Sequence, residues 1–231
     1  MKTQLARRTV LSTGLAAAAL LPLRRPTLAD ACLLLPEQAL GPYYLPDELL
    51  RADIREGKTG VPLDLKFQVL DAASCRPLKG AAIDVWHCDA VGRYSGFDQE
   101  DSTARTFLRG IQLTDDGGVA TFRTIFPGCY PGRTNHIHFQ IRTAGAIASQ
   151  TYRGGHVAHT GQVFFPEETA AALMRTGAYA KNGTARMTAP EDGIFRAQGG
   201  RASTARLTPV AAADPVRGFE ALLVAAVDPA G

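Results

Sequence analysis

The sequence predicts an all-β fold, a single-domain β-sandwich with one minor helix and long loops. Several short runs alternate apolar and polar residues with period two, as strands with one buried face do. Turn-forming residues are frequent, with 23 Gly and 14 Pro among 231 residues. Only residues 166–175 are typical of a helix, with Glu167 and Glu168 in its first turn. The length suits one domain of ordinary size.

The first 31 residues are expected to be a twin-arginine-type signal peptide, so that the folded domain spans residues 32–231. An arginine pair at 7–8 precedes an apolar run over 15–23, and an Ala-Asp-Ala cleavage sequence ends at Ala31. The apolar run is well short of the about 20 residues that cross a membrane. The sequence therefore predicts an exported protein, periplasmic or extracellular, without a membrane anchor.

The leader also explains the basic balance of the chain. It holds five of the 25 Lys and Arg and one of the 22 Asp and Glu, so the net charge falls from +3 to −1 without it. No basic surface for nucleic acid is expected in the remaining chain.

Four cysteines in an exported chain indicate two disulfides. Three pairings are possible. We favour Cys32–Cys75 and Cys88–Cys129, because Cys88 and Cys129 each precede a segment of the site proposed below.

The elements follow one another along the chain with clear turn signals between them. A hairpin is expected around Asp115-Asp116-Gly117-Gly118, and a loop after the strand that begins at His136 continues to about residue 161. A loop rich in glycine and alanine is expected to follow the helix and to continue to residue 206. The six or seven expected strands include 61–70, 81–87, 111–114, 119–126, 136–141, 162–165 and 219–227.

The strand from His136 to Ile141 carries the most informative pattern. His136 and His138 share one face, and apolar residues occupy the other. Two histidines side by side on a strand can bind one metal ion. Histidines of a buried strand that are satisfied by backbone carbonyls are an equal alternative for this pattern alone. Just upstream, two Pro-Gly pairs bracket Tyr130 and predict a rigid loop.

A second segment, residues 83–97, ends a strand and turns through Gly92 to Tyr94. Together with residues 126–139 it closely resembles the intradiol ring-cleaving dioxygenases, non-haem ferric enzymes of the protocatechuate and catechol dioxygenase type. The resemblance implies one Fe(III) per chain, held by two tyrosinates and two histidines. Anionic phenolates suit a hard ferric ion.

Carried over residue by residue, the resemblance assigns three sets of site residues. The metal ligands would be Tyr94, Tyr130, His136 and His138. The catalytic residues would be Arg133, Tyr130 and Gln162, with Arg133 polarising the bound substrate. The substrate pocket would contain Gly41, Pro42, Tyr43 and Trp86, with Trp86 and Ile83 supporting the site from behind.

The implied reaction uses O2 to cleave a small aromatic diol between its two hydroxylated carbons, giving a cis,cis-muconate-type diacid. Whether chains form a homo-oligomer stays open. Two other interpretations also stay open: a cupin-like metal dioxygenase, which would need a nearby glutamate and a third histidine, and a non-catalytic β-sandwich binding module. His87 is expected to face away from Trp86, and His156 and His159 to be exposed in a polar loop.

Overall fold

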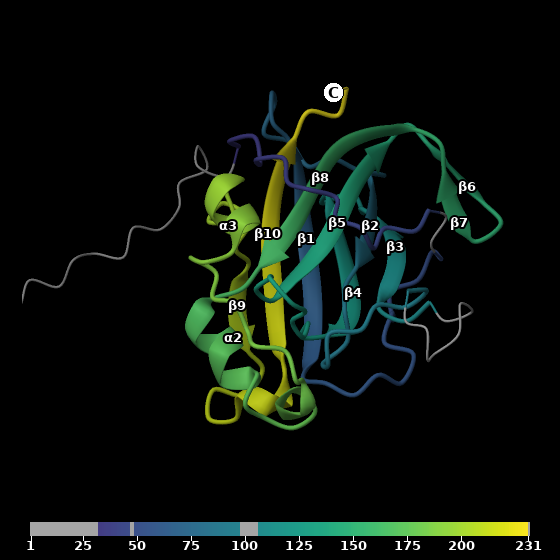
Figure 1. The fold of residues 1–231 in the computed structure, drawn as a ribbon. Coiled ribbons are helices and arrows are strands. Elements are labelled where there is room, and N and C mark those ends of the chain that lie inside the picture. The colour runs from purple at the N-terminus through teal and green to yellow at the C-terminus, as the bar shows by residue number, and fades with distance from the viewer. Residues whose placement is uncertain (1–31, 47–48, 98–105, 231) are drawn as a thin grey trace, which may run out of the picture.

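A computed structural model describes residues 32–46, 49–97 and 106–230 of the chain (Figure 1). The predicted leader, and most of the loop expected over 95–103, lie outside the described residues. Two four-stranded sheets pack face to face, which confirms the predicted sandwich. One sheet has the order β4-β1-β10-β9, with β1 (Pro62–Asp71), β4 (Val119–Ile125), β9 (Arg206–Pro209) and β10 (Phe219–Val227). The other has the order β3-β2-β5-β8, with β2 (Ala82–Trp86), β3 (Arg109–Leu113), β5 (His136–Thr143) and β8 (His156–Phe164).

The hydrophobic core lies between the two sheets. Alternate residues of β1, such as Leu65 and Phe67, are fully buried and pack with Ile137, Phe139 and Ile141 of β5. The rings of Phe67 and Phe139 lie 5.0 Å apart across the core. This packing leaves the opposite face of β5 for His136 and His138, as the period-two pattern predicts.

The prediction of a hairpin around residues 115–118 is wrong. The turn itself forms, because the side chain of Asp115 accepts hydrogen bonds from the amides of Gly117 and Val119. The two strands then enter different sheets: β3 pairs with β2, whereas β4 pairs with β1. The local turn chemistry sets the chain reversal, but burial of both apolar faces decides which strands pair.

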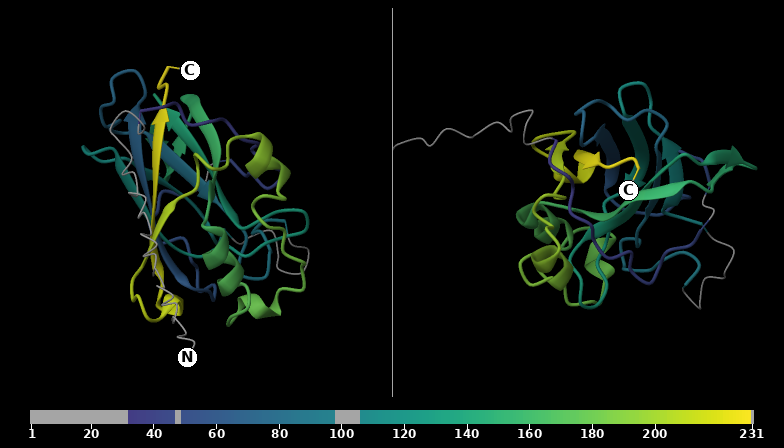
Figure 2. Two further views of the ribbon diagram at one scale, coloured as in Figure 1. Left: turned by 90° about the vertical axis from the view of Figure 1, so that its left-hand side faces the viewer. Right: turned by 90° about the horizontal axis from the view of Figure 1, so that it is seen from above.

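The predicted loop over 143–161 is largely strand. It contains the hairpin of β6 (Ala146–Ala148) and β7 (Thr151–Arg153) and the first part of β8. This hairpin projects on the side away from the helices (Figures 1 and 2). His156 is exposed, as predicted. The prediction for His159 is wrong: it pairs with Ile141 and is buried, with its ring stacked on Phe139 at 5.4 Å, because β8 begins earlier than the turn signals indicate.

In the part of the chain that the structure describes, helical structure is minor and lies in the C-terminal third. The expected helix is α2 (Glu167–Leu173), and a second short helix, α3 (Gly193–Ala197), lies within the predicted loop. Two 3₁₀ turns span Tyr179–Lys181 and Pro215–Arg217. Within the described ranges, no helix is long and apolar enough to cross a membrane.

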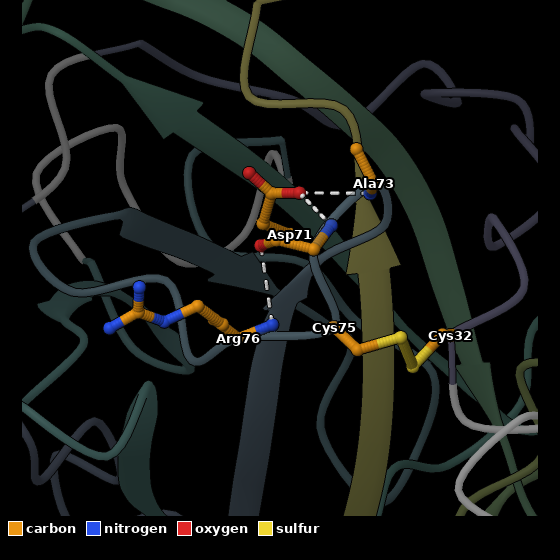
Figure 3. Close-up of a disulfide and its surroundings, with 6 residues drawn as sticks. Cys32, Asp71, Ala73, Cys75 and Arg76 are labelled. Atoms are coloured by element: carbon orange, nitrogen blue, oxygen red, sulfur yellow. Dashed lines mark hydrogen bonds between the residues drawn. A yellow bond between two sulfur atoms is a disulfide. The ribbon is translucent and has the colours of Figure 1, made fainter.

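One of the two predicted disulfides is confirmed. Cys32 and Cys75 are bonded, and Figure 3 shows the bridge beside a turn in which Asp71 accepts a hydrogen bond from the amide of Ala73 at 2.8 Å. The predicted Cys88–Cys129 bridge is wrong, because both thiols are free and buried. Cys88 packs as a small apolar side chain against an aromatic cluster instead.

Removing the Cys32–Cys75 bridge is expected to destabilise the fold. Its partners are 43 residues apart, and a bridge of this span restricts the unfolded chain enough to contribute about 2–4 kcal/mol. The double variant Cys32→Ser/Cys75→Ser should lower the free energy of unfolding in urea by that amount. Wild-type protein unfolded in a reducing agent serves as the control and should match the variant. Equal stability of the variant and the oxidised wild type would contradict the expectation.

His87 faces the core between the sheets, away from Trp86, as predicted. Its Nε2 lies 2.7 Å from the hydroxyl of Thr124 on β4, and its Nδ1 lies 2.8 Å from the Cys88 carbonyl oxygen. Burial lowers the pKa of His87 to about 4, from an ordinary value of 6.5. The folded protein therefore keeps this imidazole neutral at a pH where the unfolded chain would protonate it.

The sign of the resulting pH dependence follows from proton uptake. Because the unfolded state binds more protons between pH 6.5 and pH 4, stability falls as the pH falls through this window. Across the whole window, His87 changes the free energy of unfolding by about 3 kcal/mol. We expect His87→Gln to lose less unfolding free energy than wild type between pH 7 and pH 4, as measured by urea denaturation. Parallel pH profiles for the two proteins would contradict this.

Candidate active site

Three neighbouring strands place predicted site residues in one row. In the sheet register, Trp86 of β2 pairs with His138 of β5, and His138 pairs with Gln162 of β8. Residues paired in this way project from the same face of a sheet. His136, two residues before His138, shares the face. The row lies on the face turned away from the core between the sheets.

The two histidines are oriented toward one another. Their Nε2 atoms are 3.0 Å apart, and the Nδ1 of His136 lies 2.7 Å from the carbonyl oxygen of Thr134. Only an N–H can bond to a carbonyl, so the Nδ1 of His136 carries the proton and its Nε2 presents a lone pair. Burial lowers the pKa of both histidines well below the ordinary value, which keeps them neutral. A neutral imidazole held by its second nitrogen is the usual state of a metal ligand.

Two tyrosines complete the cluster from two separate loops. The hydroxyl of Tyr130 lies 3.2 Å from the Nε2 of His136. The ring of Tyr94 lies 5.6 Å from that of Tyr130 and 6.5 Å from that of His138. Burial raises the pKa of Tyr130 to about 12 and that of Tyr94 well above its ordinary value. The hydroxyl of Tyr94 is buried without a hydrogen-bond partner among the residues that the structure describes.

This donor set fits a hard, highly charged metal ion. Buried phenols with raised pKa values need a strong positive charge nearby before they ionise, and a ferric ion provides one. The unpartnered hydroxyl of Tyr94 and the lone pair of His136 Nε2 belong to the same cluster. Tyr94, Tyr130, His136 and His138 could therefore hold Fe(III) as ligands.

Arg133 lies directly beside the cluster. Its Nη1 is 3.3 Å from the hydroxyl of Tyr130 and 3.3 Å from the Nε2 of His136. Its Nη2 donates a hydrogen bond to Gln162. The side chain is 15% exposed, so a positive charge is available at the edge of the cluster and a small molecule there could reach it.

Gln162 links this arginine to the N-terminal segment. Its Nε2 donates to the carbonyl of Ala39 at 2.7 Å, and its backbone amide donates to the side chain of Gln38 at 2.6 Å. Because the amide group of Gln162 has partners on both sides, its oxygen is fixed toward Arg133.

The segment that begins at Gly41 packs against the cluster. Gly41 has φ +76°, and a Cβ built there would lie 2.8 Å from Cε1 of His138. Pro42 is exposed. Tyr43 stacks on Tyr94 at 4.2 Å and meets Tyr130 edge-on at 5.5 Å. Tyr43 therefore contacts both predicted tyrosine ligands.

The prediction that Trp86 lines the pocket needs correction. Trp86 is fully buried, and its ring lies parallel to that of His138 at 5.2 Å. It supports His138 from behind, because the cross-strand register places it beneath the neighbouring ring. Ile83 lies in the core between the sheets and does not support the site directly.

Sequence reasoning missed three residues that hold the segment from 127 to 138, which carries Tyr130, His136 and His138. Asp192 bonds to Arg133, Asn135 donates to the carbonyls of Pro127 and Gly128, and Arg186 donates to Asn135. Arg186 is itself paired with Glu167. The position of Asp192 before α3 marks a helix cap in the sequence. Nothing in the pattern indicates that its second oxygen reaches Arg133.

Comparisons with known proteins identify the family of the chain. A family model described as "Dioxygenase" matches residues 41–171. Catechol 1,2-dioxygenase from Candida albicans is 31% identical over 139 residues, which cover 49% of this chain and 45% of that protein. The chain thus spans about half the length of the curated relatives it matches.

Solved structures resemble more of the chain. An intradiol ring-cleavage dioxygenase from Tetranychus urticae is 34% identical with a TM-score of 0.77, covering 87% of this chain and 96% of that one. The dioxygenase domain of a dioxygenase carbohydrate-binding protein fusion from Streptomyces sp. SirexAA-E is 28% identical with a TM-score of 0.57, covering 82% and 95%. The chain therefore belongs to the intradiol ring-cleavage dioxygenase family.

Proposed function

We propose that this protein is a non-haem Fe(III) dioxygenase. It would cleave a catechol-type aromatic diol between the two hydroxylated carbons with O2, giving a cis,cis-muconate-type diacid. One observation carries the proposal: the buried Tyr94, the partly buried Tyr130 and two neutral histidines form one cluster, in which the hydroxyl of Tyr94 has no protein partner among the described residues. Each chain would hold one iron ion through Tyr94, Tyr130, His136 and His138.

The bound ferric ion would supply the Lewis acidity and redox capacity that activate the diol toward O2. The chain's own residues would bind and orient the diol. Arg133, with its Nη1 3.3 Å from the Tyr130 hydroxyl, would attract the ionised diol and stabilise negative charge on it. Gln162 would keep the guanidinium in place, and Tyr43 would contribute an aromatic wall.

Tyr130 has a second role in this proposal, as a proton acceptor. Burial raises the pKa of this phenol to about 12 in the metal-free chain. A diol must lose protons to bind as an anion, and the oxygen of Tyr130 would take up one of them. The Nη1 of Arg133 lies within hydrogen-bonding distance of that oxygen and would favour the anionic form before transfer.

The other interpretations receive less support. A cupin-like site would need a glutamate and a third histidine, whereas the described neighbours of His136 include Tyr130 and Arg133. A binding module would not require one buried and one partly buried phenol beside two imidazoles, so the catalytic proposal accounts for more of the cluster. Export through the twin-arginine leader remains part of the proposal, which places the reaction outside the cytoplasm.

The test is a visible spectrum of the purified protein with metal analysis on the same sample. Tyrosinate bound to Fe(III) should give a broad charge-transfer band that shifts when catechol is added under argon. Admitting O2 should then consume the catechol and release a diacid. Iron-replete protein that stays colourless would show that neither tyrosine is a ferric ligand, and the proposal would fail.

A further inference from the structure

We propose that Asp192 is a positioning residue that fixes the guanidinium of Arg133 beside the tyrosine–histidine cluster. The inference rests on the function proposed above and concerns how that site binds its substrate. Asp192 lies beyond the segment over 41–171 that the family model matches, in the stretch of chain between α2 and β9.

Asp192 is fully buried, and both of its carboxylate oxygens are occupied. Oδ2 accepts hydrogen bonds from Nε of Arg133 at 2.8 Å and from the amide of Thr134 at 2.9 Å. Oδ1 accepts from the amides of Ile194 and Phe195 at 2.8 and 3.1 Å. With four donors in place, the carboxylate cannot turn without breaking several bonds, so it is a rigid partner for Arg133.

The contact decides which nitrogens of Arg133 face the cluster. A guanidinium is planar, so fixing two of its nitrogens fixes the third. Asp192 holds Nε and Gln162 holds Nη2, which leaves Nη1 toward the Tyr130 hydroxyl and the Nε2 of His136. Without Asp192, Gln162 alone of these two partners would hold the guanidinium of Arg133 on the side away from the cluster. The guanidinium could then turn toward solvent, because it is already 15% exposed.

The same carboxylate also contacts the residues just before β5, the strand that carries His136 and His138. It binds the amide of Thr134, whose carbonyl orients His136 through the 2.7 Å contact to Nδ1. If the role of Asp192 is purely structural, replacing it should therefore disturb iron binding and folding. If Asp192 instead positions Arg133, replacing it should weaken diol binding while iron is retained. This loss of diol affinity would occur only when Arg133 is present.

A double-mutant cycle separates these roles. The variants are Asp192→Asn, Arg133→Gln and their combination, with Glu191→Gln as a matched control that removes an adjacent, exposed carboxylate. Asparagine caps a helix as well as aspartate does, so α3 should be preserved. Iron content, thermal unfolding and the dissociation constant for catechol under argon are measured on each iron-loaded protein.

We expect Asp192→Asn to keep its iron and to weaken catechol binding by about tenfold or more, as the loss of a charge-assisted contact does. Arg133→Gln should weaken binding at least as much, and adding Asp192→Asn to it should cause no further loss. Glu191→Gln should bind catechol as wild type does.

Additive losses in the cycle would overturn the inference, because Asp192 would then act independently of Arg133. Wild-type affinity in Asp192→Asn would also overturn it. If Asp192→Asn does not fold, Asp192→Ser, which also preserves the cap, takes its place, and failure of both would make the residue a fold determinant only. If wild-type protein shows no response to catechol, the proposed function fails and this inference falls with it.

Discussion

Tyr94→Phe is expected to abolish iron-dependent colour and ring cleavage while leaving the metal-free fold intact. The substitution removes only the hydroxyl, and that hydroxyl is buried with no hydrogen-bond partner among the described residues. An unsatisfied buried hydroxyl opposes folding, so the metal-free variant should be as stable as wild type or more stable by about 1 kcal/mol. Loss of a metal ligand should lower iron affinity at least about 100-fold, since loss of a ligand's supporting partner alone costs about 10–100-fold.

Tyr179→Phe is the matched control, because Tyr179 is a second buried tyrosine with the opposite surroundings. Its hydroxyl donates to the carbonyl of Phe126 at 2.7 Å and accepts from the amide of Val61 at 2.9 Å. This variant should lose about 2–3 kcal/mol of unfolding free energy and keep its iron and colour. Metal analysis, visible absorption and urea denaturation of both variants test the pair. Iron retained in Tyr94→Phe with an unchanged band would remove Tyr94 from the ligand set.

Gly41→Ala is expected to lower the rate of ring cleavage about 100-fold. The new Cβ would meet Cε1 of His138 at 2.8 Å, so the imidazole or the N-terminal segment must move. The Nδ1 of His138 is buried without a hydrogen bond within the described part of the chain, so its ring is held by packing against Trp86 and Gly41 and by the 3.0 Å contact between its Nε2 and that of His136. A displacement of about 1 Å at a reacting centre is enough for a loss of this size.

Gly57→Ala separates the displacement of His138 from backbone strain. Gly57 has φ +75°, nearly the value of +76° at Gly41, but a Cβ there meets no atom within 4 Å. Both variants carry the cost of a left-handed alanine, about 1–2 kcal/mol. Only Gly41→Ala should lose activity and iron affinity, measured by O2 consumption with catechol and by metal titration. Equal losses in both would show that strain alone is responsible.

The sequence predicts best what depends on alternation along one strand. The strands β1, β5 and β10 follow the period-two pattern closely, and β5 places His136 and His138 on the expected face. Tyr130 is close enough in sequence for its turn residues to place it beside them. Contacts between residues that are far apart in the sequence are harder to predict. The contact between Asp192 and Arg133 joins segments 59 residues apart and depends on how α3 packs, which no local pattern describes.

The errors have one physical origin. The turn at residues 115–118 carries a correct local signal, whereas the polar stretch before Gly161 carries a misleading one. In both segments long-range burial decided which strands form and pair. β3 and β4 separate into two sheets, and His159 is drawn under β5 beside Phe139. Likewise, proximity of Cys88 and Cys129 to the ligand loops indicated a bridge, whereas each thiol is buried without one.

The parallel pairing of β1 with β10 governs the order in which this molecule can be completed. Leu63 and Phe219 are partners although 156 residues separate them, and β10 lies between β1 and β9 in the sheet (Figure 1). A chain still emerging from the ribosome has β1 and β4 available but lacks the strand that covers the other edge of β1. Contacts of such long range slow folding, and an open strand edge invites pairing with another chain. The face that carries His136 and His138 is formed by earlier strands, so its support from the opposite sheet arrives last, and nascent chains spend that interval most open to aggregation.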